Sequence, residues 1–303
     1  MLKRAALVTC RELPDLTEDD RPLVAELARF GIAASPEIWD DPSVSWTRFD
    51  LLVIRSTWDY HRRLADFGRW IAAREAEGSA LWNPAPLLRW NAHKFYLAEV
   101  EAKGIPIVPT RFLRAGDTAD LARIFEEEGW ERAVVKPAVS AGADRTVVIG
   151  RGDADDFAPQ LETRLASGDT LVQRYLPEIE TAGEWSFVFI DGAFSHAVRK
   201  RPARGDFRVQ EHLGGMVDPG PAPRALVADA RRALGAVDFP WLYARVDAIE
   251  SSGRLLVMEL EMFEPSLFLS FAPDAGRRLA AAIARAAQEE RAGRRETVAV
   301  REG

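Results

Sequence analysis

The feature that most constrains the fold is the stretch YARVDAIESSGRLLVMELE, residues 243–261. Two apolar, strand-like runs flank a Ser-Ser-Gly turn, but Asp247 interrupts the first run and Glu259 and Glu261 interrupt the second. Because side chains alternate between the faces of a strand, Glu259 and Glu261 share one face, and Val257 is expected there too. Carboxylates on a buried strand are costly unless cations or protons balance them. The stretch therefore predicts an antiparallel hairpin with one charged face.

The turn decides whether Asp247 joins the two glutamates. A three-residue loop over 251–253, with Gly253 left-handed, would place Asp247 opposite Val257 and on the glutamates' face. A two-residue turn at Ser252-Gly253 would place Asp247 opposite Met258, on the other face. Three converging carboxylates would suit Mg²⁺, which prefers oxygen ligands. The alternative is a solvated edge hairpin without a metal.

The N-terminal part alternates strand and helix signals. AALVTC (5–10) and DLLVIRS (50–56) are apolar runs, and DDRPLVAELARFG (19–31) and RLADFGRWIAAREAEG (63–78) have helical spacing. This order predicts an α/β domain with a small parallel sheet.

Ligands bind beyond the carboxyl ends of the strands in such sheets. We therefore expect a substrate site at the end of the second apolar run, joined by residues that follow the charged strand. The candidates are Arg55, Ser56, Thr57, Trp58, Asp59, Tyr60, Glu264 and Ser266. Arg55 would pair with a substrate carboxylate, whereas the alternative makes it an ion-pair partner at the surface and Trp58 a core residue.

Two prolines in LWNPAPLLRW (81–90) indicate a first domain boundary. Beyond it, AVVKPAVSAGADRTVVIG (133–150) predicts a hairpin around a loop of small residues, and TLVQRYL (170–176) predicts another strand. EWSFVFIDGAFSHAVRK (184–200) predicts a hairpin that turns at Asp191-Gly192. We expect domains at 1–86, 87–178 and 179–303, the middle one α+β.

Basic residues lie in three places. Lys94 follows the first boundary, Lys136 precedes the small-residue loop, and RKRPARGDFR (199–208) holds several arginines. Small residues let backbone amides approach a phosphate, but a basic run is commonly only solvated, and the two commonest nucleotide fingerprints are missing. A G-x-S-x-G elbow and metal-type histidine spacing are also missing, which argues against a hydrolase.

Composition excludes several classes of function. The 47 acidic and 40 basic residues give a net charge of −7, which argues against binding to nucleic acid or an acidic membrane. A single cysteine excludes an internal disulfide, and apolar runs are too short for a membrane span. These features predict a cytoplasmic protein.

The ordered set of Lys94, VVKP, LVQRYLPEIETAGEWSFVFIDG, RVDAI and VMELE resembles the ATP-grasp ligases of the glutathione synthetase-like group. The resemblance implies the ATP-grasp fold, with an N-terminal parallel-sheet domain, a central lid domain and a C-terminal antiparallel-sheet domain. It implies ATP and one or two Mg²⁺ ions, and a small amino-acid-like substrate whose carboxylate becomes an acyl phosphate attacked by an amine-type nitrogen. It is also compatible with a homo-oligomer.

The resemblance also assigns roles to residues. The phosphate-binding set is Lys94, Lys136, Ser140, Ala141 and Gly142. The adenine set is Gln173, Arg174, Tyr175 and Leu176, with Glu184 or Glu178 for the ribose. The metal set is Asp247, Glu259 and Glu261, although the family commonly has Asn in place of Glu261. The catalytic set is Arg199, Lys200 and Arg208, with Arg245 beside the metal strand as a weaker candidate.

The segments LPDLTEDD, IRSTWDY, GDFRVQEHLGG and EPSLFL resemble a subgroup that includes the ligase forming D-cycloserine from O-ureido-D-serine. Two alternatives use the same ATP site. One is a non-catalytic nucleotide-binding sensor, and the other is a small-molecule kinase that stops at a phosphorylated product.

Overall fold

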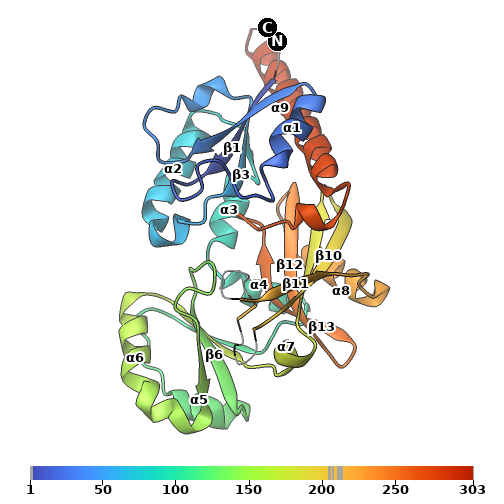
Figure 1. Ribbon diagram of the computed structural model, residues 1–303. Helices are drawn as coiled ribbons and strands as arrows, with labels where there is room; N and C mark the ends of the chain where they lie inside the picture. Colours follow the sequence, from blue (N-terminus) through green and yellow to red (C-terminus); the bar gives the residue numbers. More distant parts are fainter. Residues whose placement is uncertain (1–2, 204–205, 207, 210–213, 303) are drawn as a thin grey trace.

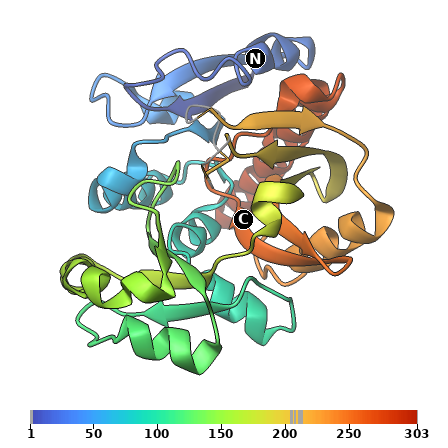
Figure 2. The same ribbon diagram turned by 60° about the horizontal axis from the view of Figure 1, so that its bottom comes forward.

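The computed structural model describes residues 3–203, 206, 208–209 and 214–302, and side chains up to residue 289. Most of the segment GDFRVQEHLGG (205–215) therefore lies outside the described residues, as does Arg204. The described residues form three sheets, and Figures 1 and 2 show them arranged around a common centre. None of the helices that the structure describes is long and apolar enough to cross a membrane.

The N-terminal sheet is parallel, as predicted. It has the order β2-β1-β3-β4, with β1 (Lys3–Thr9), β2 (Ile32–Ile38), β3 (Leu51–Ser56) and β4 (Leu81–Trp82). Helices α1 (Pro22–Arg29) and α2 (Leu64–Ala76) connect the strands, with short 3₁₀ turns at Trp46–Arg48 and Tyr60–Arg62. The long helix α9 (Ala275–Glu302) packs on α1, where Leu279 and Ile283 join Leu23 and Leu27 in one apolar core.

The central sheet is antiparallel, in the order β5-β8-β6-β7. Its strands are β5 (Thr110–Leu113), β6 (Arg132–Pro137), β7 (Val147–Gly150) and β8 (Thr170–Arg174). Helices α5 (Leu121–Glu128) and α6 (Ala154–Ser167) share a core with this sheet, and a 3₁₀ turn (Arg151–Asp153) precedes α6. The predicted hairpin around the small-residue loop is confirmed, since Val135 pairs with Val147.

The C-terminal sheet has the order β11-β10-β9-β12-β13. Its strands are β9 (Glu184–Ile190), β10 (Ala193–Arg201), β11 (Met216–Pro219), β12 (Tyr243–Ser251) and β13 (Arg254–Glu261). The turn at Asp191-Gly192 is confirmed, and both residues have the positive φ of a tight hairpin turn. Short elements complete this part: α7 (Glu178–Thr181), α8 (Arg224–Leu234) and a 3₁₀ turn (Leu269–Phe271).

Helices α3 (Ala85–Asn91) and α4 (Tyr96–Ala102) follow the N-terminal sheet. Tyr96, Leu97 and Val100 of α4 pack with α8 against one face of the C-terminal sheet. The division at residues 86 and 178 remains a prediction, and α4 contributes to the core of the C-terminal sheet. The opposite face of that sheet is divided: Val188, Ile190 and Val198 pack in one core with α9, and polar side chains occupy the part that faces the cavity.

A β-bulge sets the charged face of the β12–β13 hairpin. Ser252 and Gly253 form a two-residue turn, so Ser251 pairs with Arg254 and Ala248 with Val257. The register then shifts, and Asp247 pairs with Glu259 because Met258 is one extra residue in β13. The expectation that this turn would send Asp247 to the other face is therefore wrong.

The same bulge corrects the placement of Val257. Its side chain lies in the core with Val246 and Leu260, on the face opposite Glu259. Alternation of side chains holds on each side of the bulge, but it fails across it.

Candidate active site

A cavity of about 830 Å³ lies where the three sheets meet. The turn after β3 forms one wall, the central sheet and its small-residue loop form a second, and the charged face of the C-terminal sheet forms the third. The N-terminal wall supplies Trp58, Tyr60 and His61. A site at the carboxyl end of β3 was predicted, and the cavity is lined from Trp58, two residues beyond that end.

Asp247 is the centre of the charged face. Arg245 donates two hydrogen bonds to its carboxylate, of 2.9 Å from Nε to Oδ1 and 2.7 Å from Nη2 to Oδ2. Lys200 Nζ lies 3.2 Å from Oδ2 and also contacts Glu184, and Ser186 Oγ donates to Oδ1. Burial alone would raise the pKa of Asp247, but Arg245 and Lys200 outweigh it and hold that pKa well below its usual range.

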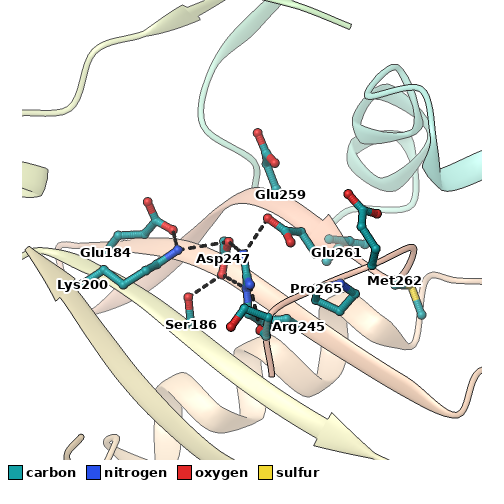
Figure 3. A network of polar contacts seen from close by, with 12 residues as sticks. Glu184, Ser186, Lys200, Arg245, Asp247, Glu259, Glu261, Met262 and Pro265 are labelled. Atoms are coloured by element: carbon teal, nitrogen blue, oxygen red, sulfur yellow. Dashed lines mark hydrogen bonds and ion pairs between the residues drawn. The ribbon is translucent and has the colours of Figure 1, made fainter. Parts of the chain in front are cut away.

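Glu259 and Glu261 differ in their partners. Lys136 Nζ lies 2.8 Å from Glu259 Oε1 and Lys94 Nζ lies 3.8 Å from Oε2, and together they lower the pKa of Glu259 against the effect of burial. Glu261 is 2.6 Å from Arg245 Nη2, yet burial raises its pKa to about 7. Figure 3 shows Glu261 turned to Arg245, whereas Glu259 points away from this network.

The three carboxylates fit Mg²⁺ by chemistry, since they are oxygen donors on one sheet face. Among the described residues, however, no group of three acidic, histidine or cysteine side chains is gathered around one ion position. Lys and Arg side chains contact the oxygens of these carboxylates instead. The metal set therefore remains a prediction.

The predicted phosphate-binding residues lie together. Lys94, Lys136 and the loop residues Ser140, Ala141 and Gly142 all line the cavity. Lys94 is tied to the loop twice, through its Nζ to Ser140 O (2.7 Å) and its backbone N to Ala138 O (2.8 Å). The loop is therefore held beside Lys94, and its role as a phosphate cover remains a prediction.

An apolar slot beside the lysines was not predicted in full. The sequence indicated Gln173, Arg174, Tyr175 and Leu176, and all four line the cavity. The structure adds Val108, Val134, Ile249 and Met258. These come from two sheets, so only tertiary packing reveals the slot. Their apolar side chains fit the flat face of an aromatic base.

The two candidate ribose residues are placed differently. Glu184 lies in the cavity wall, but it is paired with Lys200, and burial raises its pKa. Glu178 lies outside the lining and accepts a hydrogen bond of 2.9 Å from Ser251 Oγ. The choice between them remains open.

Half of the predicted substrate residues do not line the cavity. Trp58, Tyr60, Glu264 and Ser266 line it, but Arg55, Ser56, Thr57 and Asp59 are buried behind it. Arg55 pairs with Asp20 at 2.9 Å, and its side chain is 0% exposed, so it is neither a substrate clamp nor a surface residue. Its Nη2 also donates to Pro265 O at 2.9 Å, so it joins the segment after β13 to the N-terminal sheet.

The neighbours Arg199 and Lys200 point to opposite faces of β10. Lys200 faces Asp247, whereas the Arg199 guanidinium lies 4.1 Å from the Trp185 ring centroid, on the face covered by α8. The placement of Arg199 at the catalytic centre is therefore corrected, since adjacent residues of a strand cannot both face the site. Arg208 lines the cavity and bonds Asp206. Arg245, only a weaker candidate from the sequence, is the central cation.

Comparisons with known proteins agree with this geometry. The family model of the N-terminal domain of D-cycloserine synthetase DcsG matches residues 5–83, and that of the ATP-grasp domain of prokaryotic glutathione synthetase matches residues 106–224. The cycloserine biosynthesis protein DcsG of Streptomyces lavendulae is 32% identical over 297 residues, covering 92% of this chain and 97% of the relative.

Solved structures extend the likeness. The crystal structure of D-cycloserine synthetase DcsG matches with a TM-score of 0.84 at 30% identity, covering 94% of this chain and 99% of that one. The D-alanine–D-alanine ligase of Bacillus anthracis complexed with ATP matches with a TM-score of 0.68 at 15% identity, covering 96% and 99%, which shows the fold alone.

These matches define the class of the protein. It has the ATP-grasp fold and is an ATP-dependent carboxylate-amine ligase. Within that class the chain belongs to the family of D-cycloserine synthetase DcsG.

Proposed function

We propose that this ligase activates the carboxylate of a small amino-acid-like substrate and closes a ring with an amine-type nitrogen of the same molecule. The reaction would be that of D-cycloserine formation from O-ureido-D-serine. The observation that carries the proposal is the match of residues 5–83 to the DcsG N-terminal domain, because those residues supply the substrate wall of the cavity. The likeness to DcsG thus includes the part that selects the substrate.

At the nucleotide end, the apolar slot would take the adenine, and Lys94 and Lys136 would take the phosphates under the small-residue loop. Phosphate oxygens compete with Glu259 for both lysines, which now lie 3.8 and 2.8 Å from its oxygens. Nucleotide binding would therefore release Glu259. Mg²⁺ held by Asp247, Glu259 and Glu261 would neutralise charge on the transferring phosphoryl group.

The substrate carboxylate would attack the γ-phosphorus in line, forming the acyl phosphate as ADP leaves. Arg245, Lys200 and Arg208 are the cations of this wall, and they would balance the charge of the carboxylate and phosphoryl oxygens. The ureido nitrogen next to the oxygen then attacks the carbonyl carbon, phosphate leaves as the C–O bond breaks, and the nitrogen loses its proton. Hydrolysis of the carbamoyl group still on that nitrogen, which releases ammonia and carbon dioxide, would complete D-cycloserine. ATP consumption of this kind supports a cytoplasmic location.

The test is ADP release from Mg-ATP across small amino acids that include O-ureido-D-serine, with and without hydroxylamine, followed by mass spectrometry. Substrate-dependent ADP and a ring product without added amine are expected. A hydroxamate trapped by hydroxylamine would identify the acyl phosphate. A stable phosphorylated product would instead identify a kinase, and a product joined to a second molecule would contradict ring closure.

A further inference from the structure

The acidic side chains that line the cavity from the C-terminal part differ in their partners. Four of them, Glu184, Asp247, Glu259 and Glu261, each have a Lys or Arg nitrogen within 4 Å. Glu264 lines the same cavity, and within the described part of the chain it forms no ion pair. Burial, with Glu261 nearby, raises the pKa of Glu264 to about 8. An enclosed carboxylate without a cation is costly, so the site favours a ligand that brings positive charge.

Glu264 stands on a rigid support. Three successive carbonyls of residues 264–266 each accept a hydrogen bond from a long side chain of another element. The pairs are Trp58 Nε1 to Glu264 O (3.1 Å), Arg55 Nη2 to Pro265 O (2.9 Å) and Arg245 Nη1 to Ser266 O (2.8 Å). A loop held at each carbonyl presents its side chains in a fixed geometry, which is what a binding site needs.

The aromatic rings beside Glu264 join two segments into one wall. Phe263 stacks on Tyr60 with ring centroids 4.2 Å apart and an interplanar angle of 18°. The rings of Tyr60 and His61 are 6.0 Å apart, edge to face. The turn after β3 and the loop after β13 therefore meet as one surface of the cavity.

His61 gives a second, independent sign of a ligand on this wall. Its side chain is 5% exposed and lines the cavity, yet neither ring nitrogen has a hydrogen-bond partner in the described structure. The Asp144 carboxylate is 3.9 Å away, beyond hydrogen-bond reach. Burial lowers the pKa of His61, so the ring is neutral at pH 7. Buried polar atoms nearly always form hydrogen bonds, so we expect a polar group of a ligand to bond to these nitrogens.

We propose that Glu264 is the counter-ion of the substrate's ammonium group, so that this site selects zwitterionic amino acids over the same acids without the amine. The inference rests on the proposed function, which supplies the amino-acid-like substrate. It also sets the orientation of the substrate: the ammonium lies at Glu264 and the carboxylate lies toward Arg245 and Lys200. His61 then faces a neutral polar arm of the substrate.

The main rival occupant of this position is a metal ion. Glu264 follows the end of β13 and is tied to the N-terminal wall through Trp58, whereas Glu259 lies between the two lysines of the phosphate region. We therefore place the ammonium, and not Mg²⁺, at Glu264. Substitution of Glu264 should leave the Mg²⁺ requirement for nucleotide binding unchanged.

The test compares two probes that differ only in the ammonium group: O-ureido-D-serine and 3-(ureidooxy)propanoic acid. Their dissociation constants are measured by calorimetry with Mg²⁺ and a non-hydrolysable ATP analogue. The wild type should bind the zwitterion about 10- to 100-fold more tightly, the range for hydrogen bonds to a charged group. Glu264→Gln should weaken the zwitterion by that factor, leave the other probe unchanged and reduce the preference to about threefold or less.

Glu12→Gln is the matched control, because Glu12 lies at the cavity rim and is paired with Arg62 at 3.0 Å. It should keep the full preference. Glu264→Asp, which keeps the charge, should retain part of the preference for the zwitterion. It replaces Glu264→Gln as the test variant if Glu264→Gln fails to bind the ATP analogue.

Three results would overturn the assignment. One is an unchanged preference in Glu264→Gln, the second is equal binding of both probes by the wild type, and the third is a raised Mg²⁺ requirement in the variant. If the wild type binds the ATP analogue but not O-ureido-D-serine, the proposed function fails and this inference fails with it. If the Glu264→Gln enzyme still forms the ring and still prefers the zwitterion, only the role of Glu264 is contradicted and the proposed function stands.

Discussion

The two ends of the cavity balance charge in different ways. At the nucleotide end, Asp247, Glu259 and Glu261 are each matched by Lys or Arg side chains of this chain. At the substrate end, among the described residues, Glu264 forms no ion pair and neither ring nitrogen of His61 has a hydrogen-bond partner. The first end is complete without ligand, so binding there must exchange one set of partners for another. The second end is incomplete, so binding there completes it.

The comparison predicts that the nucleotide end, whose carboxylates are balanced by Lys and Arg, is critical for both stability and activity. Asp247→Asn removes the carboxylate that Arg245 and Lys200 share, although Glu261 and Glu184 remain as partners, so it should cost about 1–3 kcal/mol in the free energy of unfolding. Activity should fall by about a thousandfold or more, because the proposed metal ligand is lost. Chemical denaturation and ADP release measure the two effects.

Asp218→Asn is the matched control for that variant. Asp218 pairs with Arg201 at 3.0 Å, but both side chains are about half exposed, so the change should cost less than about 1 kcal/mol. Equal losses of unfolding free energy in the two variants would mean that the buried network stabilises the fold no more than an exposed ion pair does.

A second prediction tests the exchange of partners at the nucleotide end. Lys136→Ala and Glu259→Gln should each weaken Mg-ATP binding by about 10- to 100-fold, because each removes a charged contact to the nucleotide or its metal. Calorimetry with the two single variants and the double variant checks this. Strictly additive losses would argue against a shared site, since residues in one network are expected to couple.

A third prediction concerns the unbalanced end and the pH dependence of stability. The pKa of Glu264 is about 8 in the folded chain and near 4.3 in an unfolded one, so the folded state binds its proton more tightly. This contribution is fully present below about pH 4 and is lost as pH rises toward 8. Without ligand, the wild type should therefore lose about 3–4 kcal/mol relative to Glu264→Gln between pH 5 and 8.

Denaturant unfolding of both proteins across that pH range measures the difference. A difference that stays constant with pH would show that Glu264 titrates normally and that the substrate end is already balanced.

The smallest effect is expected from the face that does not reach the cavity. Arg199→Met should change activity by about threefold or less, because the side chain lies over Trp185 and not in the site. Lys200→Met, one residue along, should lower activity by at least about a hundredfold. Similar activities of the two variants would contradict the assignment of faces on β10.

Local sequence patterns were enough to predict many parts of the molecule. The parallel N-terminal sheet, the hairpin at Asp191-Gly192, and the small-residue loop after Lys136 all follow from short-range spacing and turn chemistry. The charged face of β13 was also visible, because two glutamates at a spacing of two must share a side.

Other parts depend on contacts between distant segments. The partner that buries Arg55 is Asp20, 35 residues earlier, and nothing near Arg55 indicates it. The slot that unites Val134 with Ile249 and Met258 exists only once two sheets face each other. The bulge leaves no local sign, since Met258 is as apolar as its neighbours.

The bulge at Met258 ties the number of residues in the hairpin to the face on which its side chains lie. With it, an even-length turn still brings Asp247 level with Glu259, and without it, if Met258 were kept, the same turn would send every later side chain of β13 to the opposite side. A residue gained or lost elsewhere in β13, with the bulge unchanged, would turn Glu259 and Glu261 toward the core. Loss of Met258 itself is the exception, because it restores regular alternation and still leaves Asp247 opposite Glu259. Related chains that are one residue shorter here should therefore lack the bulge and keep the charged face.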